Sequence, residues 1–507
     1  MAKTETASKV SRRGFLEGMA VSGVAAGALA GVKVAAQSAR STHLTTDFVV
    51  MRPGVAGLTT AIRSQKAGAR VIVLEKAWEP GGTTAHSEGF VANSRYEDMR
   101  ARAPEGDPVV QKAIADNVTN WGIFMDSIDA PVGMKAAEYV PRSFAPVGWI
   151  NFILKMLEAG GAQILVETPL IKLLQNARGE IVGVLADSPK GLIRIRAKAV
   201  VIAGGGWMTN GEMVQAHITR YFGMLRQRNA AFWDRKPPFL GDGLFAVLSI
   251  GGAPSTGGWD GFYGHMLPAR PGRITNPMAN WSAYFSPYCV AVNRFGKRFC
   301  DEGLGRTTGR PGASGSEDKC AQEVARQPDA MAAYIFDQVV YKERACENCG
   351  LGAIDKYVAY KLSGAPTAMA NSIPELAKQM EAWGVGMSAD NIVRDVTEYN
   401  IAAANGKAWA LPIPKTNTKQ AYVQDHPPYY AILGQAGITS VHGGIRVNEN
   451  AQVLHRSGKP IPGLFAAGND VGNFNNIQYL GNITMGAGLG YLAGENAAKT
   501  PTPGGGW

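Results

Sequence analysis

A strand–turn–helix–strand pattern over residues 47 to 75 constrains this chain more than any other feature. A short apolar run predicts the first strand, and residues 58 to 67 predict a helix with apolar side chains on one face. The turn between them carries Gly54 and Gly57, and the second apolar run closes with Glu75. A unit of about 30 residues in this order is the context in which a glycine-rich turn binds a dinucleotide. We therefore expect an α/β fold.

Glycine is the most unusual part of the composition. It supplies 62 of the 507 residues, in a chain that is 46% hydrophobic and 18% charged. This balance excludes an intrinsically disordered chain, and the lack of a three-residue glycine period excludes collagen. We interpret the clustered glycines as places where a ligand lies close to the backbone. Beyond the N-terminal leader they gather at residues 54–57, 81–82, 204–206, 241–243, 443–444, 463–468 and 481–494.

The formal net charge is +10, yet the sequence has no run of Lys or Arg and no nucleic-acid-binding motif. We therefore expect no nucleic-acid partner, and we interpret the charge as a basic surface that tolerates anionic substrates. The length allows two or three domains.

The N-terminus predicts export. Residues 11 to 16, Ser-Arg-Arg-Gly-Phe-Leu, resemble the twin-arginine signal, and the charge-free residues 18 to 32 are too short to span a membrane. Val34-Ala-Ala36 is the expected cleavage site, with residues 28 to 30 as the alternative. We expect a twin-arginine signal peptide over residues 1–36, a bacterial source, and a periplasmic or extracytoplasmic protein that meets the membrane only through export. This route carries folded proteins and so favours a loaded cofactor.

The five cysteines are Cys289, Cys300, Cys320, Cys346 and Cys349, an odd number. The Cys346-x-x-Cys349 pair lacks the following His that c-type haem attachment requires, and no clustered metal ligands lie near it. We expect no metal site, and either a local disulfide or two free thiols at this pair.

Further periodic segments extend the α/β pattern. Four runs alternate like antiparallel strands, at residues 163–166, 171–174, 181–186 and 192–196. An apolar strand over residues 199 to 203 leads into Gly204-Gly-Gly206, and helices are predicted after Gly241, over residues 372–383 and over about 485–498.

Several motifs occur in a fixed order. They are Ile72–Lys76, Gly81–Thr84, Gly241–Gly243, Val292–Phe299, His442–Gly444 and Ile461–Gly468. Together they resemble the FAD-binding flavoprotein family of fumarate reductases, succinate dehydrogenases and 3-ketosteroid dehydrogenases, over roughly residues 45 to 500. The resemblance implies an α/β fold in which a Rossmann-like FAD-binding domain carries an inserted α+β capping domain. The expected division is FAD-binding domain 44–260, capping domain 261–429, FAD-binding domain 430–500 and a tail 501–507.

The resemblance implies that FAD binds at the glycine turns. Thr83 stands where members with covalent flavin carry His, so we expect non-covalent FAD, with His86 as the alternative attachment point. Arg52 replaces the first Gly of Gly-x-Gly-x-x-Gly, and it either weakens flavin binding or meets the pyrophosphate as a cation. The expected cofactor-binding residues are Gly54, Val55, Ala56, Gly57, Glu75, Lys76, Gly81, Gly82, Thr83, Thr84, Ser87, Gly89, Ala203, Gly204, Gly205, Asp242, Gly468, Asn469 and Asp470.

The resemblance also implies four catalytic residues. Arg306 matches the cap arginine that delivers a proton in the reductase branch, and His442 matches a histidine that holds a substrate oxygen. Tyr430 and Tyr479 are candidates to polarise a carbonyl or move a proton, as tyrosines do in the ketosteroid branch. No Arg follows Arg456, which argues against a dicarboxylate, and seven aromatic residues between 259 and 288 favour a bulky or aromatic substrate.

We therefore expect an exported FAD-dependent oxidoreductase that reduces a C=C bond conjugated to a carbonyl or carboxylate of a small molecule. Hydride comes from flavin N5 and a proton from the cap Arg. Electrons are expected from a separate carrier, a cytochrome, quinone or similar, because the chain has no second Gly-x-Gly-x-x-Gly unit. The alternatives are a dehydrogenase that introduces a C=C bond next to a ketone, and a non-catalytic flavin-binding electron carrier.

Overall fold

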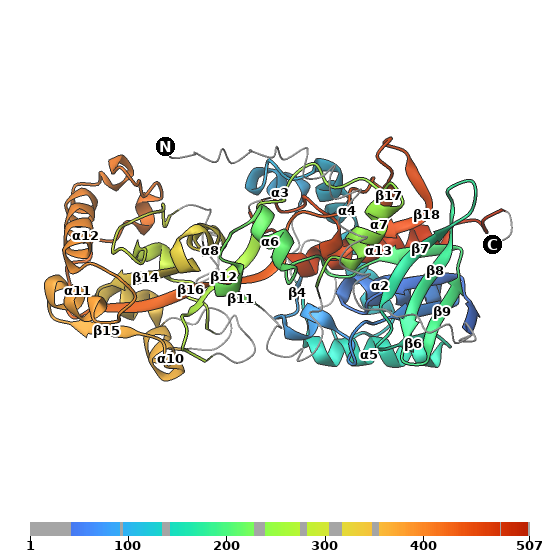
Figure 1. Cartoon of the computed structure of the whole chain (residues 1–507), viewed down its shortest axis with the longest axis horizontal. Helices are drawn as coiled ribbons and strands as arrows, with labels where there is room; N and C mark the ends of the chain where they lie inside the picture. Colours follow the sequence, from blue (N-terminus) through green and yellow to red (C-terminus); the bar gives the residue numbers. More distant parts are fainter. Residues whose placement is uncertain are drawn as a thin grey trace, which may run out of the picture.

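The chain folds into two lobes joined by one long strand. The computed structural model describes residues 42–91, 95–133, 142–227, 239–273, 281–303, 317–346, 354–476 and 478–504. One lobe surrounds a mainly parallel sheet and the other surrounds a mainly antiparallel sheet, and β16 (Tyr429–Val441) runs from one toward the other (Figure 1).

The first lobe is built on a six-stranded sheet in the order β17-β18-β10-β2-β3-β6. All neighbouring pairs are parallel except β17 with β18. The strands are β2 (Phe48–Met51), β3 (Val71–Leu74), β6 (Gln163–Leu165), β10 (Ala199–Ile202), β17 (Gln452–Leu454) and β18 (Pro460–Ala466). Strands β2, β3 and β10 are four apolar residues each and are buried throughout, as parallel strands covered on both faces are. The predicted strand–turn–helix–strand unit is confirmed.

Three helices pack on this sheet: α2 (Val55–Lys66), α5 (Pro146–Ala159) and α13 (Asn482–Ala498). Helix α4 (Pro108–Ser127) packs on α13, α3 (Tyr96–Arg102) packs on α4, and α7 (Asp242–Ser249) contacts β7 (Leu170–Gln175). Helix α6 (Gly211–His217) lies near β12 (Phe262–Pro268), between the two lobes (Figure 1). Helix α13 packs closely on α2 through glycines spaced four residues apart. A Cβ at Gly490 would lie 2.6 Å from the Ala56 carbonyl oxygen, and one at Gly494 would lie 2.8 Å from that of Thr60. We interpreted glycines 481–494 as ligand contacts; these two serve helix–helix packing instead.

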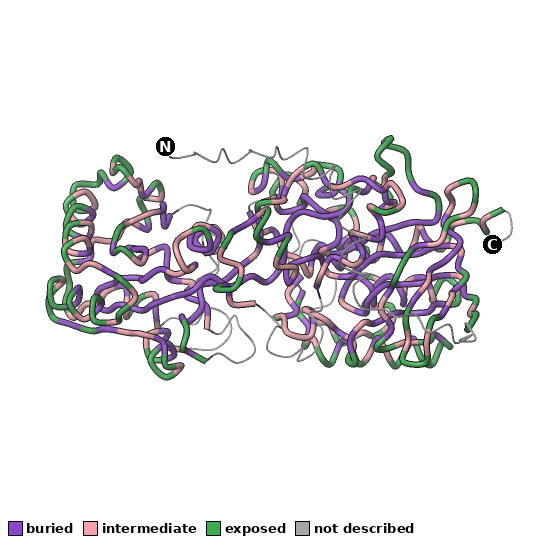
Figure 2. Tube along the Cα trace, in the orientation of Figure 1, coloured by how far each residue is buried: buried purple, intermediate pink, exposed green. Residues whose placement is uncertain are grey.

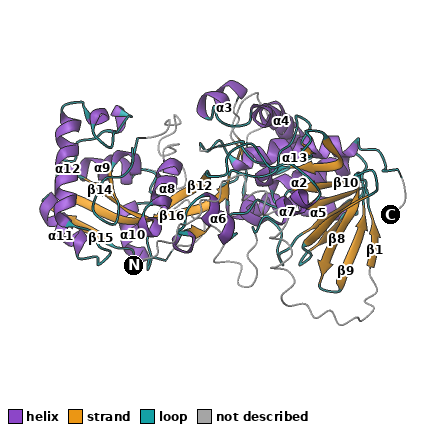
Figure 3. Cartoon of the chain, turned by 45° about the horizontal axis from the view of Figure 1, so that its top comes forward, coloured by secondary structure: helices purple, strands orange, loops and turns teal. Residues whose placement is uncertain are grey.

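A smaller sheet lies beside the first, in the order β1-β9-β8-β7 (Figure 3). Its strands are β1 (Thr42–Thr45), β7 (Leu170–Gln175), β8 (Ile181–Ser188) and β9 (Gly191–Arg196). The strands predicted in this region therefore form. The first of them, over residues 163–165, belongs to the main sheet and not to the smaller one. Residues 163–165 pair parallel with β3 in the main sheet, because alternation of side chains does not specify which strand lies next.

The cap lobe is a mixed sheet covered by helices, with a separate small core. Its strands are β11 (Arg226–Gln227), β12 (Phe262–Pro268), β13 (Val290–Val292), β14 (Met331–Phe336), β15 (Thr367–Ala370) and β16. Its helices are α8 (Glu317–Arg326), α9 (Gln338–Val340), α10 (Lys356–Ser363), α11 (Ile373–Glu381) and α12 (Ala389–Ala404). A short two-stranded antiparallel sheet, β4 (Phe90–Val91) with β5 (Arg142–Ser143), lies in the first lobe. Strand β16 is buried along nearly its whole length (Figure 2).

The two-lobed α/β architecture agrees with the expected FAD-binding domain and inserted cap. The expected boundary at residues 429 and 430 falls where β16 begins, and all four strands that pair with β16 belong to the cap sheet. We therefore propose that the cap continues to Val441. Among the described residues, no helix is both long and apolar enough to cross a membrane.

Candidate functional site

The carboxyl ends of the parallel strands meet at one edge of the main sheet. Strands β2, β3, β10 and β18 run in the same direction, so Arg52, Glu75, Gly204 and Gly468 emerge side by side. Ligands of open α/β sheets bind at this edge. The predicted cofactor residues therefore cluster where such a ligand would lie.

The turn from β2 into α2 is tightly packed. A Cβ at Gly57 would lie 1.8 Å from the Arg52 carbonyl oxygen, so only glycine lets the helix approach the strand. The backbone N–H of Val55 donates to Thr84 Oγ1 at 2.9 Å, which joins the turn to the Gly81–Thr84 segment. A Cβ at Gly468 would lie 2.8 Å from the Cβ of Ala56. Three predicted segments thus converge on the start of α2.

Two other predicted residues act locally. Ser87 Oγ donates to the Thr84 carbonyl at 2.7 Å and accepts from the Gly89 N–H at 3.1 Å. A Cβ at Gly89 would lie 2.0 Å from the carbonyl oxygen of Phe144. Both residues therefore shape the end of the turn over Gly82–His86, and the structure gives them a packing role.

Two carboxylates at this edge are buried. Glu75 accepts from the Ala77 N–H at 2.7 Å, and burial raises its pKa although Arg52 opposes the rise. Asp470 is 1% exposed and accepts from the Gly205 N–H at 3.0 Å. Burial raises its pKa to about 6, again against Arg52 and the amides of Gly204–Gly206. Its Oδ1 has no hydrogen-bond partner in the described part of the chain, so this oxygen is a buried acceptor available to a ligand hydroxyl.

Arg52 lies across the edge from β2 to β10. Its φ of +69° is the left-handed conformation that the usual glycine supplies. Its Nη1 donates to the Gly204 carbonyl at 3.2 Å, its Nη2 lies 3.7 Å from Asp242, and its guanidinium lies 5.1 Å from the ring centre of Phe239. Asp242 also binds Lys76 Nζ at 2.9 Å. The turn therefore keeps the backbone shape of the glycine motif and gains a buried cation.

These residues fit an FAD dinucleotide. Backbone at Gly54, Gly82 and Gly204 would form the cradle, Glu75 and the unpaired oxygen of Asp470 would suit ribose or ribityl hydroxyls, and Arg52 with Lys76 would supply positive charge for a pyrophosphate. FAD, when bound there, supplies hydride chemistry.

His442 stands where the cap strand β16 returns to the first lobe. Its backbone N–H donates to the Gly261 carbonyl at 3.0 Å, and its backbone carbonyl accepts from the Asn473 N–H at 2.7 Å. The residue is 3% exposed, and Nδ1 of its ring is hydrogen-bonded to the carbonyl of Asn476. Burial lowers its pKa to about 4, so the imidazole is neutral at pH 7.

The turn after His442 touches the predicted cofactor loop. The Ile445 N–H donates to the Asp470 carbonyl at 2.6 Å, and a Cβ at Gly444 would lie 2.2 Å from the same oxygen. His442 is thus two residues from backbone in contact with Asp470. The fold brings the candidate substrate residue and the candidate cofactor edge together.

Tyr479 lies beside the same end of β16. Its ring stacks on Tyr263, with centroids 3.6 Å apart and planes 8° from parallel. Its hydroxyl accepts from the Asn482 N–H at 3.1 Å, and the side chain of Asn482 is hydrogen-bonded to Ser440. His265, a weaker candidate from the sequence, lies next to Tyr263 and is hydrogen-bonded to Ser282 at 3.1 Å. An aromatic, hydrogen-bonding wall therefore forms around the end of β16.

Tyr430 lies at the opposite end of that strand. His442 lies twelve positions further along nearly all extended chain, about 40 Å away at roughly 3.3 Å per residue. Its hydroxyl is 2.6 Å from Gln338 Oε1, and its ring stacks on Tyr341 within the cap. The structure does not bring Tyr430 close to His442 and Tyr479. Tyr430 lies where β16 begins inside the cap, whereas His442 follows the other end of the strand, where it reaches the first lobe.

Arg306 falls outside the described residues, but the motif before it is firmly held. Glu302 accepts from Arg298 at 2.8 Å and from the Ala291 N–H at 3.0 Å. Asp301 accepts from the N–H groups of Gly303 and Thr416. The cap therefore anchors the chain up to Gly303. Cys349 also lies outside the described residues, and Cys346 forms no disulfide within them.

Sequence reasoning missed Asn476 and Gly261. The carbonyl of Asn476 binds His442, and Gly261 makes room for both. The Asn-rich run 473–476 was a turn signal, but nothing local indicated which side chain it would contact.

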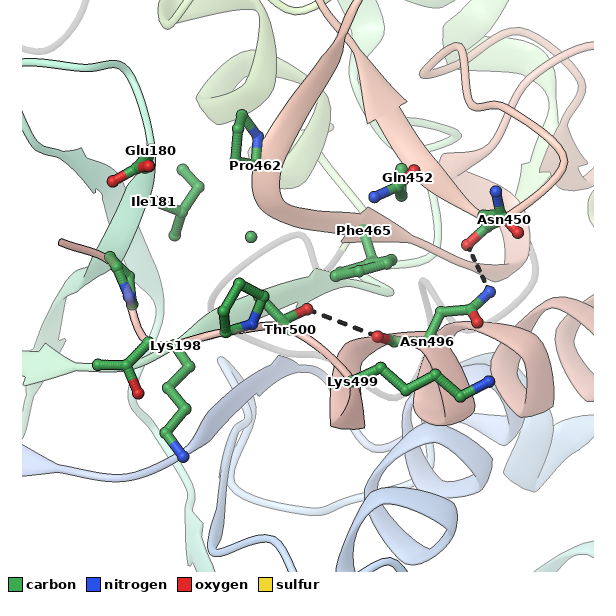
Figure 4. Close-up of a pocket in the computed structure, with 14 residues that line it drawn as sticks. Glu180, Ile181, Lys198, Asn450, Gln452, Pro462, Phe465, Asn496, Lys499 and Thr500 are labelled. Atoms are coloured by element: carbon green, nitrogen blue, oxygen red, sulfur yellow. Dashed lines mark hydrogen bonds between the residues drawn. The ribbon is translucent and has the colours of Figure 1, made fainter.

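A cavity of about 400 Å³ lies elsewhere, under residues 500–503 (Figure 4). Lys198 and Pro462 line it at the amino ends of β10 and β18, and Asn496 and Lys499 line it from α13. Because ligands of such sheets bind at the carboxyl edge, this cavity is separate from the candidate site.

Comparisons with known proteins identify the family. Residues 149–485, more than half of the chain, match the family described as FAD binding domain, and residues 47–205 match the one described as FAD dependent oxidoreductase. The chain is 27% identical over 491 residues to a fumarate reductase (cytochrome) of Shewanella frigidimarina, covering 91% of this chain and 78% of that protein. It is 24% identical over 491 residues to a vinyl phenol reductase of Lactiplantibacillus plantarum, covering 90% and 96%.

Two solved structures share the fold. The open conformation of a flavocytochrome c3 fumarate reductase matches with a TM-score of 0.64 at 23% identity, covering 98% of this chain and 83% of that one. A 3-ketosteroid-Δ4-(5α)-dehydrogenase of Rhodococcus jostii RHA1 matches with a TM-score of 0.66 at 21% identity, covering 91% and 99%. The chain therefore belongs to the FAD-binding flavoprotein family of fumarate reductases and succinate dehydrogenases and is an FAD-dependent oxidoreductase.

Proposed function

We propose that this protein is an ene reductase that reduces a C=C bond conjugated to a carbonyl or carboxylate. The observation that carries the proposal is the contact of the turn after His442 with the Asp470 loop at the cofactor edge, with the Tyr263–Tyr479 pair beside the same end of β16. Relatives named as reductases of fumarate, vinyl phenol and acrylate support it, since all three substrates carry a C=C bond. A conjugated carbonyl lowers the barrier by accepting charge as an enolate when hydride arrives.

Different residues bind the cofactor, orient the substrate and donate the proton. Glu75, Asp470 and Arg52 hold the dinucleotide at the sheet edge, and we propose that FAD is bound non-covalently because Thr83 offers no imidazole for attachment. His442 and Tyr479 orient the substrate below the cap. Arg306, three residues beyond the anchored Gly303, stays the proposed proton donor.

The substrate is proposed to lack a second carboxylate. No Arg follows Arg456 to clamp one, and the C-terminal segment instead presents Tyr479 stacked on Tyr263. Arg102 reaches this segment from α3, where its Nη2 donates to the Tyr479 carbonyl at 3.0 Å. A flat, weakly charged substrate fits these surroundings better than fumarate does.

A dehydrogenase acting next to a ketone is the second candidate. The observation in its favour is the Tyr479 hydroxyl beside the end of β16, where a phenol can polarise a carbonyl. A non-catalytic flavin carrier is the third, from the replacement of the first glycine of the turn by Arg52.

Electrons are proposed to come from a separate carrier, a cytochrome or a quinone, because the chain has one glycine-rich dinucleotide turn. The relative named fumarate reductase (cytochrome) is consistent with this source. We also propose twin-arginine export, from the Arg12-Arg13 motif that lies outside the described residues.

Anaerobic assays of the purified holoprotein test the proposal. Reduced viologen should be oxidised by α,β-unsaturated ketones, and a dye should be reduced slowly or not at all by the saturated ketones. The reverse preference would support the dehydrogenase, and a flavin that turns over with neither would support the carrier. Acid precipitation should release the yellow cofactor; retention in the pellet would contradict non-covalent binding. A protein without flavin absorbance would contradict all three.

A further inference from the structure

We propose that His442 recognises its substrate as a hydrogen-bond acceptor, with Nε2 binding a hydroxyl that the substrate donates. The inference rests on the proposed function, because it assigns the substrate to the junction of cap and cofactor edge. It adds a chemical requirement: an unsaturated substrate that carries an O–H group, such as a phenol.

The first step is the tautomer of the ring. The carbonyl of Asn476 can only accept, so the Nδ1 that is hydrogen-bonded to it must carry the proton. A neutral imidazole has a single N–H, which leaves Nε2 with a bare lone pair. Burial lowers the pKa of His442 to about 4, and Asp260 is the neighbouring charge that opposes this shift. The ring therefore keeps the acceptor at Nε2 throughout the neutral range.

The second step is that the structure holds this tautomer in place. Asn476 adopts a left-handed φ of +51°, and its side chain donates to Asn473 Oδ1 at 3.0 Å and to the Glu105 carbonyl at 3.3 Å. A Cβ at Gly261 would lie 2.3 Å from the Asn476 carbonyl oxygen and 3.0 Å from Nδ1 of His442. Only glycine at 261 therefore lets the carbonyl and the ring meet.

The third step is that Nε2 itself is unsatisfied. It is buried and has no hydrogen-bond partner among the residues that the structure describes. Buried acceptors are normally paired, so an unpaired one beside a cofactor edge is suited to a ligand donor. An ionised carboxylate has no proton to donate, and its charge would face the lone pair of Nε2. A hydroxyl satisfies the nitrogen, and the Tyr263–Tyr479 stack suits a flat ring that bears it.

A matched pair of enones tests the requirement. The probes are 4-(4-hydroxyphenyl)but-3-en-2-one and its O-methyl ether, which have the same ring and the same C=C bond but differ in the donated proton. We expect the wild-type holoprotein to prefer the phenol at least tenfold in kcat/KM. His442→Leu should erase the preference, and His442→Gln should keep part of it because its amide oxygen can accept. Equal use of both enones, or a preference that survives in His442→Leu, would overturn the inference while leaving the proposed function intact.

The N3–H group of the flavin is a second donor that Nε2 of His442 can accept from. The same variants distinguish it from a substrate hydroxyl. If the flavin supplies the donor, His442→Leu weakens FAD binding and slows both enones equally, which contradicts the inference. A base role for His442 would also slow both enones equally, but FAD binding would be unchanged; this outcome contradicts the inference too. His455 is exposed, so His455→Gln serves as the control. It should change neither the preference for the phenol nor the affinity for FAD.

The tautomer can be measured without turnover. With only 7 His in the chain, 15N labelling of histidine allows His442 to be assigned by its loss in His442→Gln. We expect a protonated Nδ1 and an unprotonated Nε2 at pH 7 in the holoprotein, and a changed signal in Gly261→Ala. A protonated Nε2 would refute the inference even if no enone is reduced. An unprotonated Nε2, together with phenol binding seen as a flavin spectral shift but no reduction, would support the inference while the proposed function failed.

Discussion

Each lobe buries a cluster of charged side chains, and the two clusters differ in how fully their charges are paired. The edge cluster, at the carboxyl edge of the main sheet, is Arg52, Glu75, Asp242 and Asp470; the cap cluster is Arg298, Glu302 and Lys415. In the edge cluster, burial raises the pKa values of Glu75 and Asp470 despite the cation between them. In the cap cluster, burial acts on Glu302 as well, but Lys415 and Arg298 outweigh it and lower its pKa.

The hydrogen bonds show the same contrast. Glu302 accepts from two nitrogens of Arg298 and from the Ala291 N–H, and Lys415 donates to the Cys289 carbonyl at 2.8 Å. Asp470 keeps one buried oxygen without a partner among the described residues. A satisfied cluster stabilises the fold, whereas an unsatisfied one stores a cost that a ligand can relieve. This difference separates a structural ion network from a binding site.

The largest expected effect comes from breaking the paired cluster. Glu302→Gln leaves Arg298 and Lys415 buried without a countercharge, and we expect it to lower the free energy of unfolding by about 3–5 kcal/mol. Urea unfolding of the holoprotein measures the change. Glu323→Gln removes a half-exposed partner of Arg326 on α8 and should cost less than about 1 kcal/mol. Similar losses in both variants would mean that the buried cap cluster stabilises the fold no more than an exposed ion pair does.

Removing a charge from the edge cluster should raise the free energy of unfolding, whereas removing one from the cap cluster lowers it. Asp470 has a pKa of about 6 in the folded protein and near 3.9 when unfolded, so its contribution to stability is present below pH 4 and is lost as the pH rises through 6. Asp470→Asn should therefore make the apoprotein more stable by up to about 3 kcal/mol at pH 8 and leave it unchanged near pH 3.5. The same variant should weaken FAD binding at least tenfold, measured by flavin fluorescence titration. Destabilisation at pH 8 would show that Asp470 is structural.

Replacing Arg52, the cation near Glu75 and Asp470, should change the free energy of unfolding by a smaller net amount. Arg52→Gly relieves a left-handed φ of +69° but leaves Glu75 and Asp470 with less countercharge. We expect a net loss of about 1–2 kcal/mol in unfolding free energy at pH 8, shrinking as the pH falls and the carboxyls become neutral. Ala451→Gly, at a buried φ of +59°, is the matched control for backbone relief alone and should be neutral or slightly stabilising. A stabilised Arg52→Gly protein would mean that backbone strain exceeds the electrostatic contribution.

The smallest expected effect tests which end of β16 carries chemistry. Tyr430→Phe should change kcat/KM for enone reduction less than twofold, because the hydroxyl binds Gln338 inside the cap. Tyr479→Phe should lower it about tenfold, since that hydroxyl lies with the His442 end of the strand. Steady-state kinetics on both variants decide between the ends, and a larger loss in Tyr430→Phe would place the substrate in the cap.

Local pattern predicted much of the first lobe. The glycine turn, α2, Glu75 and the strands over 171–196 and 199–202 follow from spacing within short windows, and the carboxyl-edge cluster follows because parallel strands end together. Contacts distant in sequence were not predictable. Gly490 and Gly494 pack against α2 across 430 residues, as the hydrogen bonds from Thr60 and Ser64 show, although both belong to a glycine segment that we assigned to ligand contact.

The chain's order of motifs alone indicated the family and the cofactor edge, because turns and strands are encoded within about 30 residues. The substrate role of His442 stays a prediction from the same motifs. Only the tertiary structure separated Tyr430 from His442, since a side chain's type does not reveal how long its strand is or where the strand ends. Only the fold brought the Asn476 carbonyl, 34 residues away, to Nδ1 of His442. That contact determines which ring nitrogen is bare, and a hydrogen bond between distant segments has no signature in either segment alone.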